Sequence, residues 1–372
     1  MTTPYPERWA QLDVTLAHDW LTGMRGGERV LEILCNGFPQ APILTLLHAK
    51  GSVSRTIASH PIRTSCLQHA PAIRKHYRYY LPLFPLAVNT MGRPDGDLLL
   101  STSHCVAKSV RTQPQTRHLS YCFTPMRYAW LFHREYLAHP AKRLLAAPLL
   151  AALRRWDRRT ARRVDRFVAI SRHVQDRITR FYGRESDVVY PPVDTDFFTC
   201  STAPREDFDL VVSAMVPYKR VDLAIDAYNA TGRALRIVGL GTESPALQAR
   251  AGTHIDFLGW QSDEAIRDLY RRARMLIFPG EEDFGIVPLE AQACGCPVVA
   301  FRKGGALETV VDGQSGVFFD RQEPAALTAA IEACAATDWN REAIRSHAER
   351  FGIPHFVSGM ADSIDRCLGR PS

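Results

Sequence analysis

Short apolar runs separated by amphipathic stretches recur along the whole chain. Runs of three to five apolar residues are typical of strands buried in a parallel sheet, and the stretches between them have the period of helices. This alternation predicts strand–helix crossovers and therefore the α/β class. The runs that predict strands are 14–17, 43–47, 98–100, 167–170, 188–190, 210–213, 235–238, 255–258, 275–278 and 298–301.

The pattern changes near the middle of the chain, which predicts two domains. A double proline at 191–192 and a polar run up to 207 suit a linker. We expect an N-terminal domain over 1–195 and a C-terminal domain over 206–354, sizes that fit a chain of 372 residues. The amphipathic tail, 355–372, is expected to form a helix that packs back towards the N-terminal domain.

Composition places the protein among cytoplasmic chains without a membrane span. No uncharged apolar run reaches 18 residues, and the first residues lack the apolar core of a secretory signal. The nine cysteines follow no regular framework and are interpreted as reduced core residues. Cys294 and Cys296 are separated by one residue with no second pair nearby, so packing is favoured over metal binding.

Positive charge is concentrated in one part of the chain. Between 142 and 184 there are 13 Lys/Arg and three Asp, a local charge of +10 against +7 for the whole protein. The stretch 131–166 predicts long helices, interrupted near Pro140 and Pro148. Basic residues spaced four apart share one helix face, where each attracts anionic lipid headgroups by about 1 kcal/mol; a solvated surface is the alternative. The arginine pairs are 154/155, 158/159 and 162/163.

A second segment, 71–91, interleaves basic residues with four large aromatic ones. Such a mixture suits a membrane interface or a nucleic acid. No stacking motif of a nucleic-acid module is present, so a membrane surface or an acceptor is the better partner and no nucleic acid is expected. A solvated helix face is the alternative here too.

The stretch 277–316 carries the strongest candidate chemistry. A strand ends at a Pro-Gly pair, three acids including Glu282 follow, and a helical pattern then carries Glu290. A second strand leads to Gly304 and Gly305. Ligands of open parallel sheets bind at the carboxyl ends of the strands, where helix N-termini present free N–H groups. Carboxylates at such a place suit a ligand with hydroxyls and phosphates; a solvated helix start is the alternative.

The first strand is followed by a glycine loop of related character. Gly26 and Gly27 open a helix after the strand 14–17, an arrangement that favours an anion. The spacing is not G-x-G-x-x-G, and a plain tight turn is the alternative. The Asp95-Gly96-Asp97 triplet is similar to a D-x-D metal–nucleotide motif, but it precedes a strand and is interpreted as a turn.

Glu282 and Glu290, with seven residues between them, match the E-x7-E motif of retaining GT-B glycosyltransferases. With HDWLTGMRGGERV, YCFTPMRYAW, SAMVPYKRVDLAI and FLGWQSDEAI, the chain resembles glycosyltransferase family 4 over nearly its whole length. The most similar branch is that of WbaZ-like O-antigen mannosyltransferases. The resemblance implies the GT-B fold, in which two Rossmann-like domains face each other across a cleft and the C-terminal one binds most of the nucleotide-sugar.

The resemblance also implies residue roles. Glu282 would contact sugar hydroxyls, Lys219 and Arg220 would neutralise the donor diphosphate, and Glu290 would hold the ribose. Preorganised cations and helix dipoles stabilise the charge of a leaving diphosphate, so no metal or cofactor beyond the donor is expected. Further substrate-binding positions implied by the resemblance are Gly26, Gly27, Arg127, Gly259, Trp260, Phe284, Gly285, Ile286 and Val287.

Two positions depart from the family pattern. Ala214 stands where many members have an arginine, and Phe123 where many have a histidine. Arg220 or an arginine of the N-terminal domain such as Arg127 could supply the missing cation. For the missing histidine three alternatives stay open: the chemistry proceeds on electrostatics alone, His18 or His104 compensates, or the protein is impaired.

The resemblance implies a retaining hexosyltransferase. The expected reaction moves mannose from GDP-mannose to a lipid-linked or polysaccharide-precursor acceptor in cell-surface glycan biosynthesis, at the inner face of the plasma membrane. A catalytically silent GT-B protein that binds nucleotide-sugar or glycan as a partner subunit is the alternative. A GT-B epimerase or phosphorylase fits the lysine and glutamate positions less well.

Overall fold

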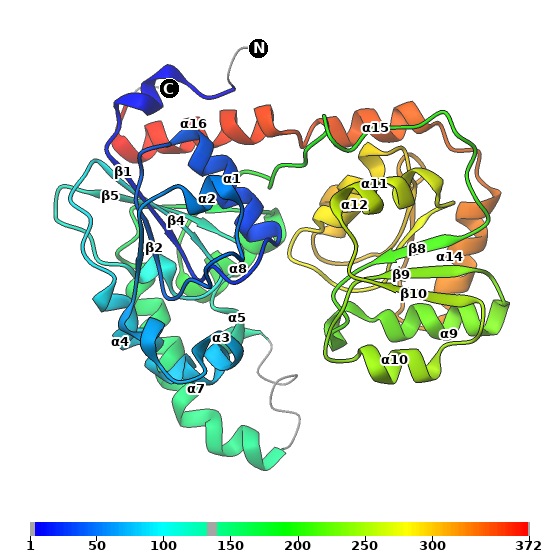
Figure 1. Ribbon diagram of the computed structural model, residues 1–372, viewed down its shortest axis with the longest axis horizontal. Helices are drawn as coiled ribbons and strands as arrows, with labels where there is room; N and C mark the ends of the chain where they lie inside the picture. Colours follow the sequence, from blue (N-terminus) through cyan, green and yellow to red (C-terminus); the bar gives the residue numbers. More distant parts are fainter. Residues whose placement is uncertain (1–3, 132–139, 371–372) are drawn as a thin grey trace. The chain divides into compact units, whose positions relative to one another are not determined.

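The structure is a computed structural model that describes residues 4–131 and 140–370. It divides into two compact units (Figure 1): unit 1 combines the chain up to Tyr190 with the segment from Phe356 onward, and unit 2 is Pro191–His355. Each unit is a parallel sheet with helices on both faces. The predicted α/β class with two Rossmann-like domains is thereby confirmed.

Unit 1 is built on a sheet of order β3-β2-β1-β4-β5-β6-β7, in which neighbouring strands run parallel. Its strands are β1 (Val14–His18), β2 (Ile43–Thr45), β3 (Ile62–Thr64), β4 (Leu98–Ser103), β5 (Arg117–Cys122), β6 (Arg166–Ala169) and β7 (Ser186–Val188). Its helices are α1 (Gly26–Gly37), α2 (Arg55–Ala58), α3 (Ile73–His76), α4 (Phe84–Ala87), α5 (Arg127–Trp130), α7 (Pro140–Ala161), α8 (Arg172–Tyr182) and α16 (Ile353–Leu368). Its 3-10 helices are η1 (Glu7–Gln11), η2 (Cys66–His69), η3 (Tyr77–Leu83), η4 (Val88–Thr90) and η5 (Ala107–Ser109).

The central strands β1 and β4 are buried along their whole length, because helices cover both faces of the sheet. Figure 1 shows α4 and α7 on one side of this sheet and α1 and α16 on the other. Trp20, Phe84 and Leu153 belong to one buried cluster on the α4–α7 side. On α16, Phe356 meets the ring of Tyr121 edge-on, with centroids 5.6 Å apart. The tail helix therefore contributes to the core of unit 1.

Unit 2 repeats the plan with the order β10-β9-β8-β11-β12-β13. Its strands are β8 (Asp209–Val212), β9 (Leu235–Val238), β10 (Ile255–Gly259), β11 (Leu276–Phe278), β12 (Val298–Phe301) and β13 (Gly316–Phe319). Its helices are η6 (Pro217–Lys219), α9 (Val221–Thr231), α10 (Ser244–Arg250), α11 (Asp263–Arg272), α12 (Ile286–Ala293), α13 (Ala306–Thr309), α14 (Pro324–Ala336) and α15 (Arg341–Glu349). Helices α9, α10 and α14 share one apolar cluster with the sheet, and α12 packs with α15.

The polar segment after the double proline lies on unit 2. The N–H of Val193 donates to the carbonyl of Phe351 at 2.9 Å, and the guanidinium of Arg345 donates to the carbonyls of Thr195 and Phe198. Because side-chain donors satisfy its carbonyls, this segment needs few apolar residues of its own.

Helix α7 runs through Pro148 without a break, whereas the sequence predicts an interruption there. Proline removes one backbone hydrogen bond from a helix interior. Residues around Pro148 are exposed, so water can satisfy the carbonyl that is left without a partner. Pro140 begins the helix, a position that tolerates proline. The predicted helical residues 132–139 lie outside the described residues.

Within the described residues, no helix combines the length and the apolarity that a membrane span requires.

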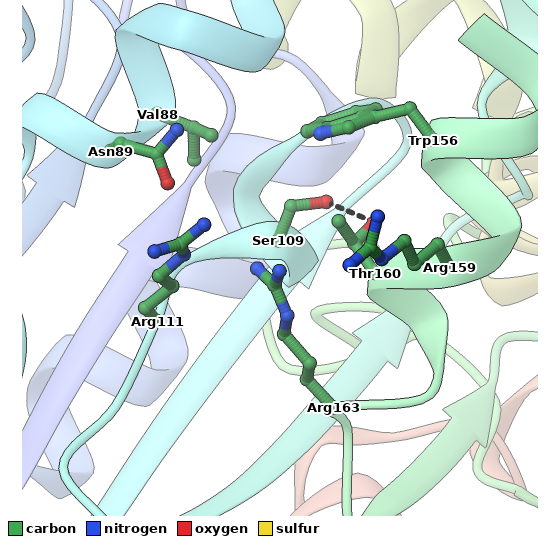
Figure 2. Close-up of a pocket in the computed structure, with 8 residues that line it drawn as sticks. All are labelled: Val88, Asn89, Ser109, Arg111, Trp156, Arg159, Thr160 and Arg163. Carbon is green, nitrogen blue, oxygen red and sulfur yellow. Dashed lines mark hydrogen bonds between the residues drawn. The ribbon is translucent and has the colours of Figure 1, made fainter. Parts of the chain in front are cut away.

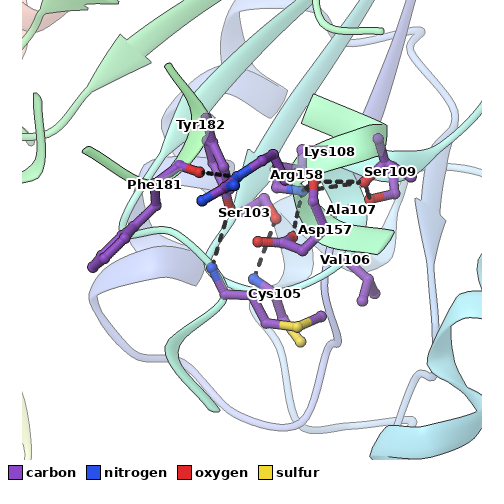
Figure 3. A network of polar contacts seen from close by, with 12 residues as sticks. Ser103, Cys105, Val106, Ala107, Lys108, Ser109, Asp157, Arg158, Phe181 and Tyr182 are labelled. Atoms are coloured by element: carbon purple, nitrogen blue, oxygen red, sulfur yellow. Dashed lines mark hydrogen bonds and ion pairs between the residues drawn. The ribbon is translucent and has the colours of Figure 1, made fainter. Parts of the chain in front are cut away.

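A buried ion pair fastens α7 to the loop after β4 (Figure 3). The ammonium of Lys108, 1% exposed, lies 2.6 Å from a carboxylate oxygen of Asp157, which is fully buried. The indole N–H of Trp130 donates to the other oxygen at 2.7 Å. The ring of Tyr182 faces the ammonium at 5.0 Å. Three helices and η5 thus meet at one pair of opposite charges.

Removal of one partner of this pair should destabilise unit 1 strongly. We expect Lys108→Met to lower the free energy of unfolding by about 3–5 kcal/mol, because it leaves the Asp157 carboxylate buried and uncompensated. The measurement is urea unfolding of unit 1 followed by tryptophan fluorescence. The matched control is Arg117→Met, which breaks the exposed pair with Asp165 and should cost about 0–1 kcal/mol. Equal losses would contradict the role given to the buried pair.

Candidate functional site

The strand order of unit 2 reverses between β8 and β11. From β8 the chain moves outward through β9 to β10, and it then returns to place β11 on the other side of β8. Loops that leave neighbouring strands in opposite directions open a crevice at their carboxyl ends, the usual ligand site of such sheets. Lys219 follows β8 and Glu282 follows β11. Two of the three residues predicted to be catalytic, Lys219 and Glu282, therefore come from the loops after the two strands at the reversal.

Lys219 and Glu282 form an ion pair between the ammonium Nζ and the carboxylate Oε1. Their side chains are 15% and 20% exposed. Close approach of the two loops depends on Gly280, where a Cβ would lie 2.8 Å from the carbonyl oxygen of Tyr218 and 2.9 Å from Cα of Lys219. A glycine at this place in the sequence thus holds the cation beside the carboxylate.

The Glu282 loop rests on the glycine turn after β12. The carbonyl of Glu282 accepts the N–H of Gly305 at 2.8 Å. A Cβ on Gly304 would lie 2.5 Å from that carbonyl oxygen, and one on Gly305 would lie 2.2 Å from Cα of Phe284. These contacts explain why two glycines stand together here: any side chain would push the acidic loop away from the sheet.

Arg220, predicted as a second cation for the diphosphate, has its charge engaged within unit 2. Its guanidinium lies 3.1 Å from a carboxylate oxygen of Asp222 and 3.2 Å from the amide oxygen of Gln322. Its backbone has φ +53°, a left-handed conformation that few non-glycine residues adopt. This conformation turns the chain from η6 into α9, so that the side chains of Arg220 and Lys219 leave the backbone in different directions.

The N-terminus of α12 lies directly after the Glu282 loop. Gly285 takes φ +92° and precedes the first turn, whose N–H groups at Ile286 and Val287 have no partner within the helix. Phe284 is only 4% exposed, so it offers its backbone and not its ring. One turn further, a carboxylate oxygen of Glu290 accepts the hydroxyl of Tyr270 at 3.1 Å, which fixes its orientation.

Glycines also line the carboxyl ends of β9 and β10. A Cβ on Gly239 would lie 2.0 Å from the carbonyl oxygen of Ser213, and one on Gly241 would lie 2.1 Å from that of Met215. The carboxyl ends of these strands therefore form a rim of backbone without side chains. Gly259 ends β10 with φ +66°, and its carbonyl accepts the N–H of Gly239 at 2.7 Å. Trp260 follows and is 75% exposed, a flat apolar surface beside this rim.

Unit 1 has its own reversal, between β1 and β4, and a buried carboxylate joins the two loops there. Asp19, fully buried after β1, accepts the backbone N–H groups of residues 104–107 at 2.6–2.9 Å. Its Oδ2 also lies 3.1 Å from Nδ1 of His104. Four N–H donors on one carboxylate hold this loop far more firmly than neutral turns do.

Gly27, Phe123 and the two histidines lie together at this edge of unit 1. A Cβ on Gly27 would lie 3.3 Å from the Phe123 ring and 3.5 Å from the His18 ring. The Phe123 ring centroid is 6.4 Å from those of both His18 and His104. Phe123 is therefore a ring neighbour of both histidines that the sequence suggested as replacements. Gly26 has open space around its Cβ position.

Arg127 begins α5 at the same edge. Its backbone N–H donates to the carbonyl of His104 at 3.4 Å. Burial lowers the pKa of His104 to about 4; the carboxylate of Asp19 opposes this shift, while the charge of Arg127 adds to it. The His104 imidazole is therefore neutral at pH 7.

His18 is held in a chain of polar contacts that leads to helix α1. Its Nδ1 lies 2.7 Å from the hydroxyl of Thr102, and its Nε2 lies 3.9 Å from Oε1 of Glu28. The other oxygen of Glu28 accepts the N–H of Arg25 at 3.2 Å, as in a capping box. Burial raises the pKa of Glu28, but the hydrogen bond and charge of His18 outweigh it and leave the pKa below its usual value.

Sequence reasoning assigned no role to Asp19, Thr102 or Glu28, although all three support the side chains just described. A signal existed for two of them. Asp19 follows a buried strand directly, and Glu28 is the third residue of a helix, where a capping carboxylate belongs. Thr102 gave no signal, because only the pairing of β1 with β4 brings it to His18.

The neutral state of His104 predicts a pH dependence. Its pKa is about 4 in the folded protein against 6.5 when unfolded, so below pH 6.5 the unfolded chain binds the proton first and stability falls. His104→Gln removes this titrating group. When the pH falls from 7 to 4.5, we expect the variant to lose about 2 kcal/mol less unfolding free energy than the parent protein. Urea unfolding at the two pH values measures it. Exposed His69→Gln is the control, and identical pH profiles for all three proteins would refute the assignment.

Two family models match adjoining parts of the chain, which together span residues 25–351. The model "Glycosyltransferase Family 4" matches residues 25–197, and the model "Glycosyl transferases group 1" matches residues 195–351.

Curated relatives match over part of their length. A D-inositol 3-phosphate glycosyltransferase of Xylanimonas cellulosilytica is 32% identical over 233 residues, which are 53% of this chain and 56% of that protein. The enzyme of the same name from Geodermatophilus obscurus is 36% identical over 219 residues, 50% of this chain and 48% of its own. The chain spans about half the length of the curated relatives it matches.

Solved structures show the same fold over nearly the whole chain. Anabaena HepE, crystallised with UDP and glucose, superposes with a TM-score of 0.72 at 19% identity and covers 95% of this chain and 99% of its own. The lipopolysaccharide outer core galactosyltransferase WaaB gives a TM-score of 0.66 at 15% identity, over 95% and 99% of the two chains. Residues 25–197 are thus similar to a Glycosyltransferase Family 4 domain and residues 195–351 to a glycosyl transferases group 1 domain, and the two parallel-sheet units have the GT-B fold of these solved structures.

Proposed function

We propose that the protein is a retaining glycosyltransferase that moves a hexose from a nucleotide-sugar donor to an acceptor hydroxyl. The observation that carries this proposal is the Lys219–Glu282 pair at the strand reversal of unit 2, next to the N-terminus of α12. A cation, a carboxylate and free helix N–H groups at one strand edge match the needs of a ligand that joins a sugar to a diphosphate. The two matched domains support the same reaction class.

In this proposal Lys219 acts on the leaving group. Breaking the bond between the anomeric carbon and the diphosphate oxygen leaves negative charge on the diphosphate. A preorganised ammonium and the N-terminus of α12 stabilise that charge without a metal ion. Lys219 would exchange its contact with Glu282 for a diphosphate oxygen. Arg220 contributes less, because Asp222 and Gln322 already engage its guanidinium.

Glu282 and Glu290 are proposed to bind the hydroxyls of the donor. Glu282, released from Lys219, would accept hydrogen bonds from the sugar as its anomeric centre becomes oxocarbenium-like. Glu290 is oriented by the Tyr270 hydroxyl and is proposed to bind the ribose. The exposed Trp260 and the bare backbone at Gly259 would hold the base. The roles of Gly26, Gly27 and Arg127 at the phosphates stay predictions.

The donor we propose is GDP-mannose, on the resemblance to O-antigen mannosyltransferases. HepE was crystallised with UDP-glucose, which makes a uridine donor the competing choice. A thermal-shift comparison of GDP, UDP and ADP separates the two, because a ligand that binds only the folded state raises Tm with its affinity.

Substitution of the ion pair tests the function. We expect Glu282→Ala and Lys219→Gln each to slow donor turnover by about 10²–10³-fold, the loss seen when one preorganised charge contact is removed from a transition state. Lys219→Gln should also reduce the Tm increase produced by the preferred nucleoside diphosphate. Turnover is measured as nucleoside diphosphate release from GDP-mannose and UDP-glucose.

The neighbouring lysine–glutamate pair supplies the matched control. Lys303 lies 3.0 Å from Glu281, and its side chain is 59% exposed. Lys303→Gln should leave turnover within about threefold of the parent, since an exposed pair contributes little. Equal rates in Glu282→Ala and the parent would refute the role of Glu282. Nucleotide binding without turnover on any donor would favour the catalytically silent alternative.

The proposed acceptor is a lipid-linked glycan precursor reached at an anionic membrane surface. Unit 1 exposes large apolar side chains on the two segments, 71–91 and 131–166, for which the sequence suggests contact with a membrane surface. In α7, Leu144 and Leu145 are 77% and 82% exposed. In η3 and α4, Tyr79 and Leu86 are 82% and 70% exposed. Exposed leucines on a helix with a basic second half suit the interface of a charged bilayer.

Vesicle sedimentation tests this membrane contact. We expect binding to anionic vesicles at low salt, loss of most binding in Leu144→Ser/Leu145→Ser, and weaker binding at high salt, which screens the arginines. Leu307→Ser is the control, because that leucine is 54% exposed on unit 2. Binding unchanged by the double substitution, or absent at low salt, would contradict a membrane role for α7.

A further inference from the structure

The arginine pairs of α7 have two different environments in unit 1. Arg154 donates to the carbonyl of Ala129 at 2.7 Å, and Arg158 donates to the carbonyl of Phe181 at 2.9 Å. These two arginines are thus engaged by neighbouring backbone. Arg159 lies in the last turn of α7, and Arg163 lies in the turn that follows the helix end at Ala161. Among the described residues, no hydrogen bond or ion pair engages these two guanidinium groups, so the predicted continuous stripe is divided.

Arg159 and Arg163 open onto a cavity of about 160 Å³, which has the volume of about five water molecules. Figure 2 shows the guanidinium groups of Arg111 and Arg163 directed into the same space, with the amide of Asn89 facing them. The residues that line the cavity are Val88, Asn89, Ser109, Arg111, Trp156, Arg159, Thr160 and Arg163.

The cavity has a polar floor that is itself fully buried. The hydroxyl of Ser109 donates to that of Thr160 at 2.8 Å, and both residues are 1% exposed. Behind them, the ammonium of Lys108 lies 3.4 Å from the Thr160 hydroxyl. The indole of Trp156 forms a wall. Hydroxyls, an amide and guanidinium forks are the groups that proteins use to bind phosphoryl oxygens.

No carboxylate balances the three arginines. Among the residues that the structure describes, none of Arg111, Arg159 and Arg163 has an acidic side chain within 4 Å. Asp157, the acid on the same helix, is buried and engaged by Lys108 and Trp130. The pKa of Arg163 lies below its usual value because of burial and then the charges of Arg111 and Arg159. This mutual repulsion is relieved when an anion enters the cavity.

Part of the cavity wall belongs to the connection between β4 and β5, because Ser109 and Arg111 follow His104 along it. Arg163 lies three residues before β6 begins, and Val88 and Asn89 precede β4. These positions lie towards the amino ends of the strands. Asp19, Gly27 and His104 follow the carboxyl ends. The transfer proposal uses other residues for the donor, namely Lys219, Glu282 and the N-terminus of α12 in unit 2.

We propose that Arg111, Arg159 and Arg163 form a binding site for a phosphomonoester dianion on unit 1. Three guanidinium groups favour a phosphate of charge close to −2, as a monoester carries at pH 7, over a carboxylate or a phosphodiester. The phosphate can belong to a lipid headgroup or to a small soluble ester. The site goes beyond the proposed transfer reaction and does not depend on it.

The test compares two double variants that remove the same charge from the same helix end. All four arginines are exposed, but Arg159→Gln/Arg163→Gln removes two that line the cavity, whereas Arg155→Gln/Arg162→Gln removes two that do not. All arms use the full chain with Lys219→Gln, so that phosphate at the proposed donor site does not contribute. Inorganic phosphate is titrated by calorimetry at constant ionic strength. We expect the cavity variant to raise the Kd at least tenfold and the matched variant to change it less than twofold.

A second arm identifies the source of the phosphate. Phosphatidylcholine vesicles that contain phosphatidic acid present a monoester, and vesicles with phosphatidylglycerol of equal surface charge present a diester. If phosphatidic acid is preferred and only the cavity variant loses this preference, the phosphate belongs to a lipid headgroup. If the tenfold effect is seen with inorganic phosphate alone, the phosphate belongs to a soluble ester. Equal losses in both double variants, or no binding of phosphate and no preference between the vesicles, would overturn the site. Nucleoside diphosphate binding to protein with Lys219 intact tests the donor proposal separately.

Discussion

The parallel direction of every strand is the constraint on which the rest of this molecule depends. In a parallel sheet all carboxyl ends lie at one edge, so the loops that follow the strands are collected there whatever their separation in sequence. In unit 2 the order reverses between β8 and β11. Lys219 and Glu282, separated by 62 positions of chain, meet as an ion pair at that reversal. In unit 1 the same reversal lets the Asp19 carboxylate bind the loop after β4.

Close backbone approach turns this constraint into a site of defined geometry. Gly280, Gly304 and Gly305 each stand where a Cβ would collide with the backbone of a neighbouring loop. Their absence of a side chain lets the acidic loop lie against both the β8 loop and the β12 turn. The consequence is electrostatic, since a cation and a carboxylate that are mostly shielded from water interact more strongly than an exposed pair. The exposed Lys303–Glu281 pair nearby illustrates the difference.

Unit 1 uses buried charge in a different way. Asp19 is stabilised by backbone N–H groups, and Lys108 with Asp157 forms an ion pair that fastens α7. Both arrangements fix loops, and neither one neutralises the charge of the arginines that lie nearby. His104 is kept neutral beside Asp19, and the arginines at the end of α7 surround a cavity without a carboxylate. Polar groups that do not serve the packing of a core are where binding is to be sought.

The amino-acid pattern by itself determined the class of fold, most strands and the positions where chemistry could lie, because apolar periodicity and glycine placement are local properties of the chain. It did not reveal β5, whose buried His118 and Ser120 look unlike a core strand; His118 is accommodated there because the side chain of Ser101 contacts it across the sheet, 2.9 Å away. It also could not distinguish Lys219 from Arg220 as cations for the diphosphate. Arg220 adopts a left-handed backbone conformation, and its guanidinium pairs with Asp222. It presented the α7 arginines as one stripe. Only tertiary structure decided which of them pack on backbone carbonyls and which face a cavity, because burial and charge pairing depend on residues far apart in sequence.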